Sequence, residues 1–341
     1  MSDVLADALV DGLADGLTGL QAGVRRLLTV CLCLAVTPTG AEPLTAGDEY
    51  AIQAPLVSRS LFLDGAAIGE HMVVVGERGH ILVSRDAGIS WTQAEVPTRV
   101  TLTGVSLYDR ARGWAVGHDA VILRTRDGGN TWETVYAAPE EERPLLDVWF
   151  QSADRGFAVG AYGLFLETRD AGDSWHPRAI DDGDPHLNHI AAASTDRLYI
   201  AAEAGVVFRS DDGGQGWKRL PSPYVGSFFG TLPLDDTRVY LYGLRGHLYF
   251  SADGGESWHA VETSTGSLLT NGIPIGADGV LFTGMGGTVL IGQRAGRSVR
   301  RLQRADRQGI AGALVAGDDA LVIYGESGVV RMPRSRLEDP Q

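Results

Sequence analysis

The chain has 341 residues, of which 44% are hydrophobic and 21% charged, and this composition is typical of a globular protein with a buried core. Its formal net charge of −14 at pH 7 argues against a general nucleic-acid binder, because such proteins carry positive charge for the phosphates. The 45 glycines suit a fold with many turns.

The first element in chain order is a predicted targeting segment over residues 1–41. Arg25 and Arg26 precede an apolar run at 27–36, and small residues follow, with Thr39 and Ala41 placed where a signal peptidase cleaves. The run is shorter than the roughly 20 apolar residues that a membrane-spanning helix needs. We therefore predict a secretory signal and an exported protein, in a periplasm or a compartment like the thylakoid lumen. Two alternatives stay open: a translation start nearer residue 24, and an uncleaved N-terminal anchor.

Both cysteines, Cys31 and Cys33, lie inside this apolar run. If the signal is removed, the mature chain has no thiol for a disulfide, a nucleophile or a metal site. Val30 and Leu32 stand where a lipoprotein box would need a small residue, so we do not expect lipidation.

A motif of eight residues then repeats five times along the chain. Each copy reads Ser/Thr-x-Asp-x-Gly-x-x-Trp, and we call these segments boxes. They span residues 84–91, 125–132, 168–175, 210–217 and 251–258. Their tryptophans are spaced by 41, 43, 42 and 41 residues, which indicates a structural repeat of about that length.

A second element precedes each box and occurs seven times. It consists of an apolar strand, a glycine-rich turn and another apolar strand, with turn positions at Gly76, Gly117, Gly160, Ala202, Gly243, Gly284 and Gly325. In the sixth repeat the box has decayed to GQRAGRSV, with Arg294 in place of the aspartate and Val299 in place of the tryptophan. The seventh repeat has no box.

Each repeat contains several apolar runs of four to six residues between turn signals, which is typical of strands. Four such strands in about 40 residues indicate one blade of a β-propeller. We therefore predict an all-β, seven-bladed β-propeller of four-stranded antiparallel blades over residues 48–336, followed by a tail at 337–341. Residues 50–59 are predicted to supply the missing outer strand of blade seven and so to close the ring.

Every residue type in the box has a reason in folding. The aspartate can accept hydrogen bonds from the turn, the glycine permits a positive φ, and the tryptophan can wedge between blades. We predict a structural role for Asp86, Trp91, Asp127, Trp132, Asp170, Trp175, Asp212, Trp217, Asp253 and Trp258. Calcium binding is the alternative, but one carboxylate per turn is a thin ligand set, so we expect no metal and no cofactor.

The boxes resemble those of the bacterial-neuraminidase, or Asp-box, repeat superfamily. Within it, residues 111–132 and 154–175 are similar to the photosystem II stability and assembly factor family. The resemblance covers blades one to five well and blades six and seven weakly. It implies a seven-bladed propeller exported to a lumen or periplasm and, in photosynthetic members, binding to an unassembled membrane-protein subunit. Members use surface arginines for partner contact, but no short motif carries those positions over to this chain.

Candidate binding residues come from charge and loop position. Residues 294–336 hold nine arginines and four acids, a local positive excess in an acidic protein. We predict that blades six and seven dock an acidic protein segment or an anionic lipid surface; solvated strand faces are the alternative. Loops at the end opposite the boxes offer further contacts. The candidates are Arg294, Arg297, Arg300, Arg301, Arg304, Arg307, Arg331, Arg334, Arg78, Arg245 and Tyr162. We expect a monomer that binds a membrane-associated protein and no nucleic acid.

The main alternative function is a glycoside hydrolase or a carbohydrate-binding propeller. A glycosidase needs two carboxylates about 5–9.5 Å apart in a cleft, and Glu77, Asp119, Glu203 and Glu326 could face the central cavity. However, sialidases resemble six-bladed rings with an Arg-Ile-Pro motif, which this chain lacks. We therefore assign no catalytic residue. A zinc site at His176, His186 and His189 is weaker still, because loop histidines are usually solvated.

Overall fold

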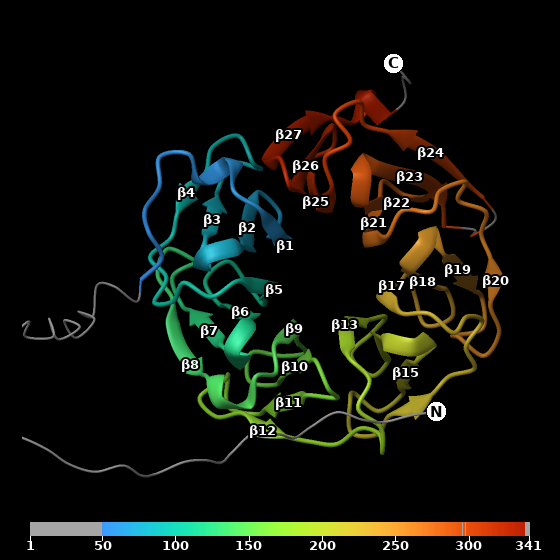
Figure 1. Cartoon of the computed structure of the whole chain (residues 1–341), viewed down its shortest axis with the longest axis horizontal. Coiled ribbons are helices and arrows are strands. Elements are labelled where there is room, and N and C mark those ends of the chain that lie inside the picture. The colour runs from blue at the N-terminus through green and yellow to red at the C-terminus, as the bar shows by residue number, and fades with distance from the viewer. Residues whose placement is uncertain (1–49, 295, 297, 338–341) are drawn as a thin grey trace, which may run out of the picture. The chain divides into compact units, whose positions relative to one another are not determined.

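The computed structural model describes residues 50–294, 296 and 298–337. They form seven antiparallel sheets that follow one another around a central axis (Figure 1). The prediction of an all-β, seven-bladed propeller is confirmed. The predicted targeting segment over 1–41 lies outside the described residues, as does the predicted tail apart from Leu337.

Six blades have four strands each, in sequential order from the axis outward. Blade one comprises β1 (Phe62–Ile68), β2 (His71–Gly76), β3 (Ile81–Ser84) and β4 (Thr92–Gln93). Blade two comprises β5 (Leu102–Leu107), β6 (Gly113–Gly117), β7 (Ile122–Thr125) and β8 (Glu133–Tyr136). Blade three comprises β9 (Leu145–Phe150), β10 (Gly156–Gly160), β11 (Phe165–Thr168) and β12 (His176–Pro177). Blade four comprises β13 (Leu187–Ala192), β14 (Leu198–Ala202), β15 (Val207–Ser210) and β16 (Lys218–Arg219).

Blade five comprises β17 (Phe228–Pro233), β18 (Val239–Gly243), β19 (Leu248–Ser251) and β20 (His259–Ala260). Blade six comprises β21 (Leu269–Ile275), β22 (Gly279–Gly284), β23 (Thr288–Gln293) and β24 (Val299–Gln303). The described part of blade seven has three strands, β25 (Ile310–Ala316), β26 (Ala320–Gly325) and β27 (Gly328–Pro333).

The middle strands of each blade are apolar because neighbouring blades cover both of their faces. All six residues of β2, for example, are buried. Burial on two faces removes the alternation of polar and apolar residues that a half-exposed strand would show. The hydrophobic core consequently lies between the blades, where side chains of adjacent sheets meet.

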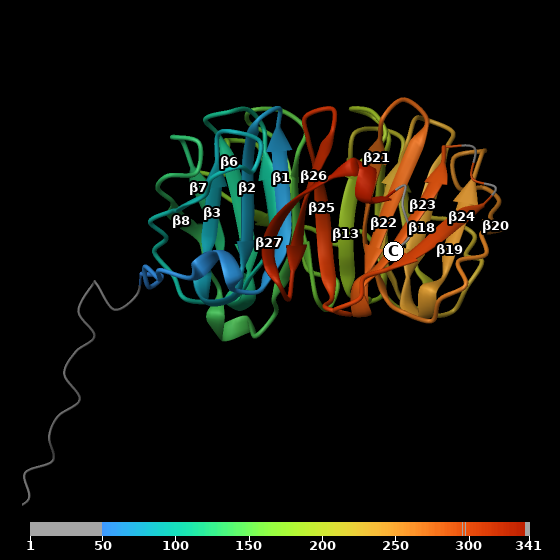
Figure 2. The same ribbon diagram turned by 90° about the horizontal axis from the view of Figure 1, so that it is seen from above.

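The two ends of the ring carry different turns (Figure 2). The boxes form the hairpins between third and fourth strands, while the turns between second and third strands lie at the opposite end. Short 3₁₀ turns occur at η2 (Val57–Arg59), η3 (Glu77–Gly79), η4 (His118–Ala120), η5 (Pro139–Glu141), η6 (Glu203–Gly205), η7 (Leu244–Gly246), η8 (Met285–Gly287) and η9 (Arg334–Leu337). Within the described residues, no helix is both long and apolar enough to span a membrane.

The prediction that residues 50–59 close blade seven as its outer strand is wrong. Residues 51–54 instead follow the outer edge of blade one, where the Ala51 amide donates to the Val96 carbonyl over 2.9 Å. The Ala54 amide donates to Oε1 of Gln93, also over 2.9 Å. Pro55 then offers no amide to a ladder, and the chain turns through η2 into β1. The hydrogen bonds that would have extended blade seven are thus made to blade one.

The ring closes through side chains. Trp91 and Ala87, from the box of blade one, pack in one cluster with Leu314 and Val322 of blade seven. Closure therefore uses the same contact that joins blades one to five to one another, in which each box packs against the blade before it.

Candidate binding surface

The box aspartates are engaged by their own turns. In blade one, Asp86 accepts hydrogen bonds from the Ser90 amide (2.9 Å), the Ser90 hydroxyl (2.5 Å) and the Ser84 hydroxyl (2.8 Å). The Ser84 hydroxyl also accepts from the amide of Gly88 over 2.8 Å. The same pattern recurs around Asp127, Asp170 and Asp253, and in reduced form around Asp212. These bonds occupy the oxygens that a cation would need.

Hydrogen bonding also fixes the charge of these aspartates. Donation from the Ser90 side chain lowers the pKa of Asp86 to about 2, because the bond favours the ionised form. Donation from Ser174 and Ser257 lowers the pKa of Asp170 and Asp253 to about 2 in the same way. These carboxylates therefore stay ionised over the physiological range.

The glycine at the fifth box position is required by close approach to the preceding blade. Gly88 has φ +79°, and a Cβ there would lie 2.3 Å from a methyl group of Val322 in blade seven. Any larger residue would combine an unfavourable backbone conformation with a clash. Each box is thereby pressed onto its neighbour.

The box tryptophans fill the space between blades. Trp132 of blade two is 5% exposed and packs with Val73 and Val83 of blade one. Trp217 of blade four lies edge-on to Phe165 of blade three, with ring centroids 5.9 Å apart. Because a buried tryptophan removes roughly 150–250 Å² from water, these contacts contribute strongly to the joints between blades.

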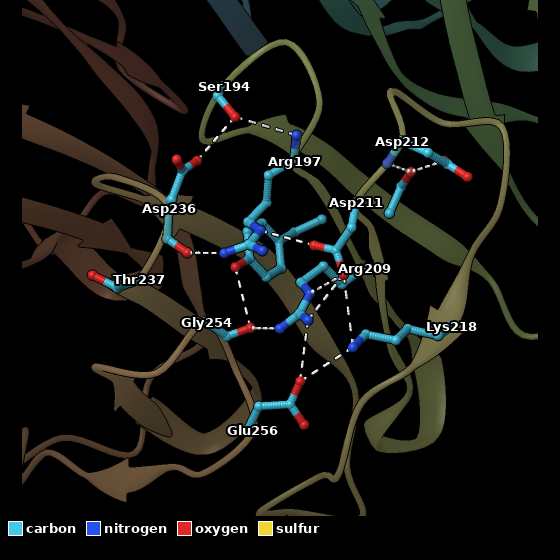
Figure 3. Close-up of polar contacts among 12 residues, drawn as sticks. Ser194, Arg197, Arg209, Asp211, Asp212, Lys218, Asp236, Thr237, Gly254 and Glu256 are labelled. Carbon is cyan, nitrogen blue, oxygen red and sulfur yellow. Dashed lines mark hydrogen bonds and ion pairs between the residues drawn. The ribbon is translucent and has the colours of Figure 1, made fainter.

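Arginines on third strands tie several joints together. The Arg209 guanidinium donates to the Gly254 carbonyl of the next box over 2.5 Å, between Asp211 and Glu256 (Figure 3). Arg124 of blade two donates in the same way to the Ala171 carbonyl of blade three, over 3.0 Å. Each arginine thus satisfies a box carbonyl and orients two acidic side chains at the joint.

Arg331, one of the predicted partner contacts, makes the equivalent bond at the closing joint. Its Nε donates to the Ala87 carbonyl of the first box over 3.1 Å. Blade seven has no box, but its third strand carries the arginine that hydrogen-bonds to the box of blade one. We therefore assign Arg331 to the closure of the ring.

The remaining arginines of blades six and seven lie at different heights along the ring. Arg294 is in the hairpin between β23 and β24 at the box end, and Arg300 and Arg301 are on β24. Arg304 and Arg307 are in the connection from β24 to β25 at the opposite end, and Arg334 is in η9. Arg297 lies outside the described residues. The sequence cluster is therefore a stripe over the outside of blade six and the end of blade seven.

Few of these arginines are neutralised. Within the described part of the chain, the ion pairs of this stripe consist of Arg304 with Asp306. Arg300 donates to the Leu337 carbonyl over 2.5 Å and Arg301 to the Ser264 carbonyl, and neither contact removes the positive charge. The stripe therefore retains the positive excess that the sequence indicates.

Arg78, Arg245 and Tyr162 lie at equivalent positions in the turns opposite the boxes. Their φ values are +56°, +56° and +53°, which holds each side chain at the tip of its turn. Tyr162 is exposed and its ring contacts His186 edge-on, with centroids 4.8 Å apart. These turns belong to blades one, five and three, and they lie at the same end of the ring as Arg304 and Arg307.

The structure shows a feature that the sequence did not indicate: a groove of about 860 Å³ between blades six and seven. Its floor is apolar, with Leu281, Ile310, Leu321 and Met332, and its lining includes Arg301, Arg304 and Arg336. Blade seven has no box tryptophan to pack onto blade six, and Leu337 packs there with Leu281 and Leu321 instead. Loss of the box therefore leaves an apolar groove beside the arginine stripe.

Three of the four carboxylates considered for a glycosidase accept hydrogen bonds from backbone amides, and the fourth, Asp119, lies in η4. Glu77 Oε1 accepts from the Leu61 amide (3.1 Å), Glu203 Oε2 from the His186 amide (3.4 Å), and Glu326 Oε2 from the Gly309 amide (2.6 Å). Each bond joins a turn to the chain entering its own first strand. These acids thus hold the turns at the end opposite the boxes.

Four side chains of the innermost strands also join blades, a role that was not predicted from the sequence. His189, expected to be a loop histidine, is one of them and lies on β13. Each of the four accepts a hydrogen bond from an amide of the next blade, and together we call them the inter-blade belt. The pairs are Asp64 with Val105 (2.8 Å), Asp147 with Ile190 (2.9 Å), His189 with Thr231 (3.4 Å) and Asn271 with Ala313 (3.4 Å). All four follow a β-bulge near the start of the first strand. Alignment of the seven first strands could have found them, because each lies two residues after a buried Phe or Leu.

The belt contains groups with perturbed pKa values. Burial raises the pKa of Asp64 to about 7, and the nearby charge of Asp147 adds to the rise. Burial likewise raises the pKa of Asp147 to about 7 and lowers that of His189 to about 4. His189 is therefore neutral beside Asp147, with Nε2 and Oδ2 3.8 Å apart.

Comparison with known proteins identifies the family. The model of a family described as photosynthesis system II assembly factor YCF48 matches residues 56–140 and 138–307, most of the propeller. The chain belongs to this family. The resemblance expected from the boxes is therefore confirmed.

Curated relatives of the family match a limited part of the chain. Photosystem II assembly protein Ycf48 of Thermosynechococcus vestitus is 40% identical over 141 residues, which cover 40% of this chain and 40% of that protein. Photosystem II assembly lipoprotein Ycf48 of Trichormus variabilis is 38% identical over 138 residues, which cover 40% and 41%. The chain thus spans about two fifths of the length of these relatives.

Solved structures of the family share the fold. One described as YCF48 bound to D1 peptide has a TM-score of 0.67 at 18% identity, covering 84% of this chain and 96% of its own. YCF48 from Cyanidioschyzon merolae has a TM-score of 0.66 at 17% identity, covering 84% and 99%. At these identities the likeness supports the propeller fold.

Proposed function

We propose that this protein is an exported, non-catalytic assembly factor that holds a segment of a membrane-associated protein against blades six and seven. Its family is that of a photosystem II assembly factor, and one solved member is described as bound to D1 peptide. Relatives named as a lipoprotein and as a chloroplastic factor support export. The residues of the boxes and of the joints are engaged in holding the ring, which leaves other surfaces to bind.

The observation that carries this proposal is the stripe of arginines beside the apolar groove. Arg301 and Arg304 line the groove, so positive charge borders an apolar surface. That combination suits a protein segment with acidic and apolar side chains, since the charges steer the encounter and the apolar contacts hold it.

The test is capture of a partner from solubilised membranes by the purified protein. Arg301→Glu with Arg304→Glu should reduce capture at least tenfold, and salt should weaken capture by the unaltered protein. Arg110→Glu with Arg126→Glu, at the box end of blade two, changes the net charge equally and should capture normally.

Two results would contradict the proposal. One is equal capture by the reversed pair and the control pair. The other is binding of the unaltered protein to protein-free vesicles of phosphatidylglycerol as strongly as to the membrane extract, which would make the stripe a lipid contact.

A further inference from the structure

The outermost described strand of blade seven is β27. β27 pairs with β26, and no strand among the described residues pairs with its other edge. In each of the other blades a fourth strand covers that position. A bare edge presents backbone donors and acceptors to any extended chain that approaches it.

The side chains of β27 divide between two surroundings. Arg331 points to blade one, where it bonds to Ala87, and Val329 packs in the core of the same joint. Val330 and Met332 face the opposite side and line the groove against blade six. A strand added beside β27 would therefore place every second side chain over the groove, because strand side chains alternate between faces.

The length that can pair is limited at both ends. At Gly328, a Cβ would lie 2.0 Å from the Ser58 carbonyl oxygen, so η2 already occupies the space beside this end. At the other end Pro333 has no amide. The edge that can receive a chain consequently runs over residues 329–332.

The charge beside this edge selects the occupant. Arg301 and Arg336 line the groove and are exposed, so a docked chain lies within reach of both guanidinium groups. A second copy of this protein would bring the same arginines to the same place, and like charges oppose that pairing. An acidic chain has the opposite and favourable interaction.

We propose that an extended acidic segment of a partner protein adds to β27 as the fourth strand of blade seven. Its backbone pairs with residues 329–332, its apolar side chains enter the groove beside Val330 and Met332, and its carboxylates meet Arg301 and Arg336. This is recognition by strand addition, in which backbone bonds give affinity and alternate side chains give specificity. The inference rests on the proposed function and specifies its mode of binding.

The experiment uses the full chain and a phage-displayed library of random 12-residue peptides. Selected peptides should alternate acidic and apolar residues. They should slow exchange at least tenfold at those amides of residues 329–332 that do not bond to β26. Methylation of alternate peptide nitrogens on the pairing edge should reduce affinity at least tenfold, because it removes the donors of the added strand.

Two matched variants locate the site. Val330→Asp places a carboxylate in the groove and should weaken peptide binding at least tenfold. Val315→Asp makes the same change on β25, at a valine that is 37% exposed against 38% for Val330, and should bind normally. Equal melting temperatures of the two variants would show that the loss is local.

Three outcomes would overturn the inference. Peptides that bind the Val330→Asp variant with full affinity would place the site elsewhere. Slow exchange, in the free monomeric protein, of the amides of residues 329–332 that do not bond to β26 would mean that a segment of this chain already covers the edge. Slow exchange that appears only with dimerisation would make a second copy the occupant. Loss of membrane-partner capture with intact peptide binding at the groove would contradict the proposed function and leave this site standing.

Discussion

Replacing Trp132 with alanine tests whether the boxes serve architecture. The side chain is 5% exposed, and burying a tryptophan removes roughly 150–250 Å² from water. At about 25 cal/mol per Å² this burial is worth about 4–6 kcal/mol, and truncations of large buried aromatic residues cost about 3–5 kcal/mol. We expect Trp132→Ala to lower the free energy of unfolding by about 3–5 kcal/mol.

Urea and thermal unfolding followed by circular dichroism would measure this loss, which corresponds to a fall of about 10 °C in Tm for a domain of this size. Trp258→Ala is the graded control. Trp258 is partly exposed, so its truncation should cost less. An unchanged Tm for Trp132→Ala would refute the stabilising role of this tryptophan between blades one and two. If the folded Trp132→Ala variant no longer captured the partner, Trp132 would be a binding residue.

Three further changes test other parts of the structure. Arg331→Ala should lower Tm by about 3 °C, because it removes one partly buried charged hydrogen bond at the closing joint, and partner capture should persist. If Arg331→Ala lost partner capture without any change in Tm, Arg331 would be a partner-binding residue and not a closure residue. Asp64→Asn should raise Tm above pH 7.5, with a gain that fades toward pH 5. Because folding raises the pKa of Asp64 from 3.8 to about 7, its contribution to stability is present at low pH and is lost as pH rises through 7. A gain that is constant with pH would contradict this. Chelation with EDTA should leave Tm unchanged, because hydroxyls and turn amides already donate hydrogen bonds to the carboxylate oxygens of Asp86 and Asp127. A rise in Tm of more than 5 °C on addition of calcium would contradict this prediction.

Local chemistry made the blades predictable from the sequence. Each box combines a Ser or Thr, an Asp, a Gly and a Trp at fixed spacing, and each feature acts within one hairpin or on the adjacent blade. The turn glycines likewise mark a backbone conformation that few other residues adopt. Repetition of these signals at intervals near 41 residues gave the number of blades and the position of each hairpin.

Features that depend on contacts between distant segments could not be predicted in this way. Arg331 and Ala87 are 244 residues apart, and only the closed ring shows that they meet. Closure by a strand from residues 50–59 was a reasonable expectation, but Gln93 and Val96 of blade one offered these residues other partners. The groove lies where blade seven has no box tryptophan and, among the described residues, no fourth strand, so it has no sequence motif of its own.

Hydrogen exchange across the whole chain, with and without the captured partner, tests the central claim most directly. We expect binding to slow exchange in residues 299–304 and 328–337 and to leave the box hairpins of blades one to five unchanged. Slowed exchange in those hairpins, with blades six and seven unaffected, would contradict it.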